Sequence, residues 1–174
     1  MIINNKEIVF RPDTPIPYFQ VTDDYRIRFG YEKLTTSLIR KVLSLVLQDR
    51  TMHLCVCYRT IEDRHSRDNR PKLGKYFNIT NWKEDIMIDN EDTSIKYQMV
   101  NVKNILIESI IKYAIEMIIH EKPEAFIHFY DDTVDIYITN DVIDIVSTDK
   151  QLIEILKNDY EKVYDRYWVG KEFE

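Results

Sequence analysis

The chain has 174 residues and a formal net charge of −6, with 44% hydrophobic and 31% charged residues. This length and composition suit one globular domain spanning residues 1–174, long enough to bury its own core. The sequence has only three glycines, too dispersed for any Gly-rich phosphate loop or nucleophile elbow, which excludes the motifs of P-loop ATPases, Rossmann dehydrogenases and α/β-hydrolases.

Hydrophobic periodicity in residues 1–100 predicts several short strands and one helix. Tyr25–Tyr31 alternates cleanly, with Ile27 and Phe29 on one face and Arg26 and Arg28 on the other, as in a half-buried strand. Apolar residues at helical spacing then predict a helix over 35–48, capped by a threonine or serine at its start. Further strands are expected at 8–10, 52–58, 73–79, 86–88 and 95–100, and a charged loop at 62–75.

The C-terminal part predicts a helix over 102–121, three strands, and a last helix. The strands are expected at 125–130, 133–139 and 142–147. Asp131-Asp132 and Asn140-Asp141 separate them, and these residue types tolerate the left-handed conformations of tight hairpins. A capping box, Thr148-x-x-Gln151, then opens a helix that we expect to run to about Trp168.

These elements predict an α+β fold, a mainly antiparallel sheet with three helices packed on one face. Each helix carries a single apolar stripe and can therefore cover only one side of the sheet. We expect the other side of the sheet to be free.

The free face carries the candidate binding site. Two-residue hairpin loops would place Tyr130 opposite Thr133, His128 opposite Asp135, and Tyr137 opposite both Phe126 and Asp144. With Arg26 and Arg28 from the earlier strand, the candidate binding residues are Phe126, His128, Tyr130, Asp135, Tyr137 and Asp144. Antiparallel sheets commonly have one solvated face, so simple solvation is the alternative explanation for these side chains.

Two groups of residues are also compatible with an enzyme, which is the alternative hypothesis. A His128–Asp135 pair resembles the base and orienting group of a catalytic triad, although the sequence alone places no nucleophile beside it. His53, Cys55 and Cys57 share one strand face, but zinc prefers four ligands and the sequence supplies no obvious fourth. The alternative is thus a small hydrolase or metal-dependent enzyme, whereas the leading hypothesis requires no catalytic residue, metal or cofactor.

Charge is spread unevenly along the chain. Residues 1–87 carry 15 basic and 11 acidic side chains, and residues 88–174 carry 9 and 19, so the halves are +4 and −10. An acidic total argues against general nucleic-acid binding. A nucleic-acid regulator acting through the Arg64–Arg70 loop is a third hypothesis, which the absence of aromatic residues in that loop disfavours.

The sequence also indicates where the protein resides. Its first ten residues lack the basic start and apolar stretch of a secretory signal, and no run approaches the roughly 18 apolar residues of a membrane span. Cys55 and Cys57 are too close together for a disulfide framework and fit free thiols better. We expect a cytoplasmic protein without membrane contact.

Two stretches of the chain resemble a family of bacterial domains of unknown function. The first runs from Tyr130-Asp131-Asp132 through Asp141–Val146, where a strand pair lies near a D-x-x-x-D-[IV] segment, and continues into a Tyr-rich helix that ends at Tyr167-Trp168. The second is Ile27-Arg28-Phe29-Gly30, a strand before a helix. Together they cover about a third of the chain, and the resemblance implies no activity.

The leading expectation is a non-enzymatic protein-interaction module, of the immunity or inhibitor type. Its partner would be another protein, docked through the free sheet face or the acidic C-terminal half, since complementary potentials speed encounter. Small acidic α+β proteins of this kind look like immunity or antitoxin proteins by size, charge and class.

Overall fold

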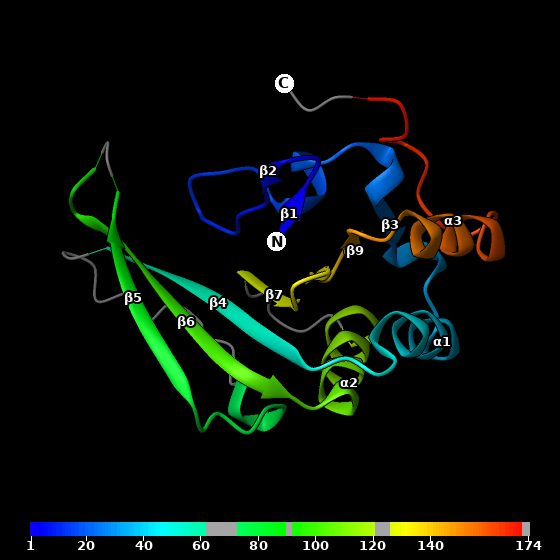
Figure 1. Ribbon diagram of the computed structural model, residues 1–174. Helices are drawn as coiled ribbons and strands as arrows, with labels where there is room; N and C mark the ends of the chain where they lie inside the picture. The colour runs from blue at the N-terminus through cyan, green and yellow to red at the C-terminus, as the bar shows by residue number, and fades with distance from the viewer. Residues whose placement is uncertain (62–72, 90–91, 121–125, 172–174) are drawn as a thin grey trace.

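A computed structural model describes residues 1–61, 73–89, 92–120 and 126–171. The main sheet has seven strands in the order β3-β9-β8-β7-β4-β6-β5, and every neighbouring pair is antiparallel (Figure 1). Its strands are β3 (Arg26–Gly30), β4 (Met52–Ile61), β5 (Trp82–Ile88), β6 (Ile95–Ile105), β7 (Phe126–Tyr130), β8 (Val134–Ile138) and β9 (Val142–Ser147).

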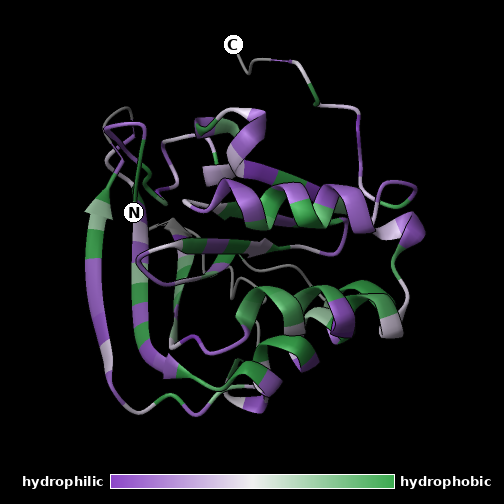
Figure 2. Ribbon diagram, turned by 45° about the vertical axis from the view of Figure 1, so that its right-hand side comes forward, coloured by the Kyte–Doolittle hydropathy of each residue, from purple (hydrophilic) through white to green (hydrophobic). Residues whose placement is uncertain are grey.

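Three helices pack on one face of this sheet, which confirms the predicted α+β class. They are α1 (Thr36–Leu47), α2 (Ile107–Ile119) and α3 (Lys150–Asp159). One continuous core joins their apolar stripes to the inward residues of the strands, among them Phe29, Val56 and Phe129. Green apolar positions on the helices in Figure 2 alternate with purple polar ones, as expected for helices with one buried stripe.

The opposite face is covered by the N-terminal segment, residues 1–25, so the prediction of a free face is wrong. In Figure 1 this blue segment lies above the central strands of the sheet, whereas α1 and α2 lie below them. It contains the two-stranded sheet of β1 (Ile2–Ile3) and β2 (Lys6–Glu7) and two short 3-10 turns, and it buries Ile3, Ile8 and Tyr18 against Val146. Prolines do make much of it irregular, but enough apolar side chains remain to form a second, smaller core.

Tight turns are built differently from the prediction. Asn4 and Asn5 have φ values of 50° and 61° and form the left-handed corner between β1 and β2. The predicted left-handed turns at Asp131-Asp132 and Asn140-Asp141 do not form. The Asp131 side chain instead accepts hydrogen bonds from the amides of Thr133 and Val134, both at 2.7 Å.

Several element boundaries also differ from the predictions. The predicted strand at 8–10 is absent, and Leu73–Lys75 forms a 3-10 turn where a strand was expected. Helix α2 begins at Ile107 because β6 continues to Ile105. Helix α3 is capped by Asp149 rather than Thr148 and ends at Asp159, so the tyrosine-rich residues that follow form turns.

Candidate functional site

Four of the predicted site residues lie in one row across the sheet, on the face opposite the helices, and Arg26, Tyr130 and Asp135 lie in the next row of that face. Arg28 pairs with Asp144, Asp144 with Tyr137, and Tyr137 with His128. The row continues through Cys55 and Asn101 on the next two strands. Directly opposed residues on adjacent strands have Cβ atoms about 5 Å apart, so this register brings together groups that are far apart in sequence.

Most of the predicted site residues are buried beneath the N-terminal segment. Asp144 is 1% exposed, Asp135 5% and His128 6%, and Arg26, Arg28 and Tyr137 are also buried. Phe126 and Tyr130 are half-buried. The row is therefore an interior polar layer and not the open binding platform that the sequence predicts.

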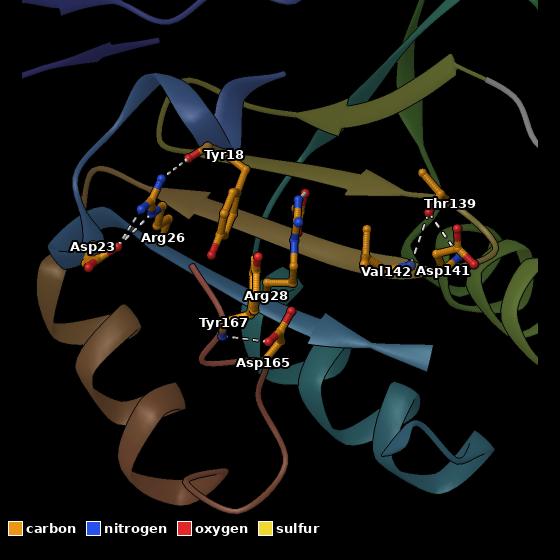
Figure 3. A network of polar contacts seen from close by, with 10 residues as sticks. Tyr18, Asp23, Arg26, Arg28, Thr139, Asp141, Val142, Asp165 and Tyr167 are labelled. Atoms are coloured by element: carbon orange, nitrogen blue, oxygen red, sulfur yellow. Dashed lines mark hydrogen bonds and ion pairs between the residues drawn. The ribbon is translucent and has the colours of Figure 1, made fainter. Parts of the chain in front are cut away.

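Arg26 and Arg28 tie the N-terminal segment to the sheet (Figure 3). Arg28 makes a bidentate ion pair with Asp144, with nitrogen–oxygen distances of 2.5 and 2.6 Å. Arg26 pairs with Asp23 at 2.7 Å and donates to the carbonyl of Tyr18 at 3.0 Å. The Tyr18 ring lies 4.6 and 4.2 Å from the guanidinium carbons of Arg26 and Arg28, so it contacts both cations.

Burial shifts the pKa values of this layer. It raises the pKa of Tyr18 to about 12, although the nearby Arg26 acts in the other direction, so the phenol stays neutral. It also raises the pKa of Asp144 to about 6, against the two hydrogen bonds from Arg28 that act to lower it. The ion pair thus links β3 to β9, but the cost of removing its two charges from water largely offsets the attraction between them.

His128 and Asp135 form the expected pair by a different register. Tyr130 lies opposite Asp135 and His128 opposite Tyr137, so the β7–β8 hairpin is shifted by two residues from the prediction. A shift of two keeps every side chain on its predicted face, and Nδ1 of His128 still hydrogen-bonds Oδ2 of Asp135. The Phe10 ring stacks on His128 with centroids 3.6 Å apart.

A cavity of about 370 Å³ lies beside this pair, between the N-terminal segment and the sheet. Residues 7–11 form one wall, and strands β4, β5, β6 and β7 form the other, with His128 and Asp135 in its lining. A second hollow, of about 440 Å³, lies where β3 ends against the C-terminal segment, away from the polar row. Its charged residues Glu32, Lys33, Glu161 and Arg166 are solvent-exposed, and we assign it no role.

Cys55 is the residue beside His128 that sequence reasoning did not place. The β4–β7 register sets it directly opposite His128, completing a cysteine, histidine and aspartate on three neighbouring strands. Burial raises the pKa of Cys55 to about 12 and that of Cys57 to about 11. The thiolate is the reactive form of cysteine, so this thiol is a poor nucleophile at neutral pH.

The predicted metal and nucleic-acid sites gain no support. His53 accepts a hydrogen bond from the Asn104 amide at 3.2 Å, and among the described residues no group of three or more ligand side chains is placed to hold a metal ion. The arginines of the predicted basic loop, Arg64, Arg67 and Arg70, lie outside the described residues.

The residues missing from the predicted site come from the N-terminal segment. Phe10, Tyr18 and Phe19 all contact the polar row, and for this region the sequence predicted only the strand at 8–10 and no contact with the site. The available signal was the number of apolar and aromatic residues between positions 1 and 21, which is high for an exposed connector.

Comparison of the chain with models of protein families, with curated proteins and with solved structures finds no match. The resemblance to a bacterial family of unknown function therefore stays a prediction. In the part of the chain that the structure describes, no helix has both the length and the apolar character needed to cross a bilayer.

Proposed function

We propose that this chain is a non-enzymatic protein-interaction module, of the immunity or inhibitor type, which docks its partner along the outer edge of β5. The observation that carries this proposal is an open strand edge lined by large, exposed apolar side chains. Since the N-terminal segment covers the predicted docking face, β5 takes its place as the candidate surface.

Along one side of strand β5, the backbone groups have no strand partner within the described part of the chain. Strand β5 is the last strand of the sheet and pairs with β6 alone among the described strands. Backbone hydrogen bonds from Asp89 to Ile95 and from Lys103 to Asn81 mark both ends of that ladder. Because hydrogen-bonded pairs alternate in antiparallel sheets, the amides and carbonyls of residues 82, 84, 86 and 88 point away from β6.

Three side chains among these residues add an exposed apolar surface next to the open edge. Trp82 is 54% exposed, Ile86 64% and Ile88 55%, and the alternation of the strand places all three on one face. The opposite edge of the sheet is treated differently, since the Asp165 amide bonds the Arg28 carbonyl of β3 at 2.8 Å. Proteins usually blunt an exposed apolar edge, so an open one supports binding by strand addition.

The charges near this edge favour a basic partner segment. Within β5, Glu84 and Asp85 are exposed beside one exposed lysine, Lys83, while Asp89 and Asp92 follow at the tip of the hairpin. The −10 charge of residues 88–174 has the same sign. An extended basic strand would gain both backbone pairing and electrostatic attraction here.

The test is affinity capture from the source cells, with the captured partner identified by mass and its binding then measured directly. We expect Ile86→Glu to weaken binding at least tenfold, because it places a charge in the apolar stripe. The matched control is Ile155→Glu, which introduces the same change at a 48% exposed position on α3 and should leave affinity unchanged. Equal affinities for the two variants would overturn the proposal.

The hydrolase alternative meets one requirement, since a cavity does lie beside His128. The nearest cysteine is however held in its protonated form by burial, as its raised pKa indicates. We therefore place the binding function first.

A further inference from the structure

We propose that the cavity under the N-terminal segment is a binding site for a small organic cation, an amine or a guanidine with several N–H donors. The cavity is bounded by Glu7 and Phe10 on one side and by Asp85, Met99 and His128 on the sheet. This site lies on the face of the sheet opposite the Trp82, Ile86 and Ile88 stripe, so it is distinct from the proposed docking edge.

Most of the charged side chains in the lining of the cavity are carboxylates. Glu7 and Asp85 are exposed carboxylates, and neither forms an ion pair with a described residue. Asp131 and Asp135 add two more carboxylates, bound to Arg50 and His128 respectively. The one arginine in the lining, Arg11, is already paired with Asp13 at 2.8 Å. A ligand rich in donors and positively charged complements such a wall.

The pair of His128 and Asp135 points independently to a ligand with a donor group. The His128 side chain is only 8% exposed and forms part of the cavity wall. Nδ1 is hydrogen-bonded to Asp135, and Nε2 has no partner among the described residues. The second oxygen of Asp135, Oδ1, is buried and has no hydrogen-bond partner among the described residues, so it is an acceptor without a donor. Buried polar groups without partners are uncommon in proteins and usually mark bound water or ligand.

The remaining lining suits the hydrocarbon part of such a cation. Met87, Met99 and Phe10 supply apolar surface next to the carboxylates. Methionine side chains adapt to irregular ligands, and an alkyl chain can lie along them while its charged end reaches the acidic groups. The same chemistry is offered by a free amine and by the end of a lysine or arginine side chain.

The test is a titration of the full chain with agmatine, which carries a guanidinium and an ammonium on a four-carbon chain, followed by calorimetry and by the NMR signals of the His128 ring. We expect saturable binding that shifts these signals, and no binding of the uncharged 1-pentanol. A blocked tripeptide with a central arginine forms the second arm. Tighter binding of agmatine than of this peptide indicates a free cation as ligand, and the reverse indicates a protein side chain.

Asp85→Lys should weaken agmatine binding more than tenfold, because it replaces a wall carboxylate by an ammonium. Asp159→Lys makes the same charge change at an exposed position at the end of α3 and should alter affinity less than twofold. Glu7→Gln, a milder change, should cost about threefold. No shift of the His128 signals at about 10 mM agmatine, or an equal loss in the two lysine variants, would overturn the proposal.

Discussion

At the scale of single residues, the Arg28–Asp144 pair illustrates how a charged pair is kept inside a sheet. The Asp144 side chain is 1% exposed and that of Arg28 10%, so water screens the pair little. Both carboxylate oxygens accept a hydrogen bond from the guanidinium, and Tyr18 stacks against its other face. The pair therefore contributes to the register between β3 and β9 more than to net stability.

Removing one member of this pair should be far more damaging than removing both. Arg28→Met leaves a buried carboxylate without its partner and should lower the free energy of unfolding by about 3–5 kcal/mol. The double variant Arg28→Met with Asp144→Leu should recover much of this loss, since no charge is then left buried. Urea unfolding of the four proteins in the cycle measures the coupling. Additive losses would contradict this account.

The sequence predicted which face these side chains occupy but not what they meet. Alternation placed Arg26 and Arg28 opposite Ile27 and Phe29, and the structure agrees because the pleat enforces a period of two. Which strand lies next to β3 depends on tertiary packing, so the pairing with Asp144 was not predictable. The same holds for Cys55 and His128, which are brought together by two strands 73 residues apart.

At the scale of elements, the start of α3 can be capped by either of two neighbouring residues, Thr148 or Asp149. The sequence suggests a Thr148-x-x-Gln151 capping box, whereas in the structure the Asp149 side chain accepts from the Gln151 amide at 2.9 Å. Asp149→Ala should therefore cost about 1 kcal/mol of unfolding free energy. Thr148→Ala, the adjacent control, should cost only a few tenths. Thermal or urea unfolding measures both, and a larger loss for Thr148→Ala would restore the predicted box.

Helices were predictable where an apolar stripe was bounded by clear signals. Thr35 caps α1 as expected, accepting from the Leu38 amide at 3.2 Å. The start of α2 was misplaced because Val102 and Ile105, three residues apart, fit a helical stripe as well as a strand. Beyond the strand expected at 8–10, no element was predicted before residue 25 because the apolar residues there follow neither period, although they form a second core against the sheet.

At the scale of the whole molecule, the sheet is covered on both faces near its centre and open at one end. The helices cover one face and residues 1–25 the other, while β5 is the edge strand with no further strand beside it among the described residues (Figures 1 and 2). Strand β4 lies between β7 and β6 and carries Cys55 and Cys57. We therefore expect the backbone amides of β4 to be the best protected from hydrogen exchange and those of β5 the least protected.

The two thiols of β4 allow the opening of this strand to be measured by chemical labelling. Burial raises the pKa of Cys55 to about 12 and that of Cys57 to about 11, so at pH 8 both are protonated in the native state. A raised thiol pKa means that thiolate forms only when the strand opens, where the ordinary value of about 8.5 applies. Labelling of the thiols by a disulfide reagent should then be slow. The labelling rate should depend on urea concentration as global unfolding does, because β4 cannot be exposed without separating from β7 or β6. Fast labelling of Cys57 alone, with little dependence on urea, would show instead that the end of β4 opens locally while the sheet stays folded.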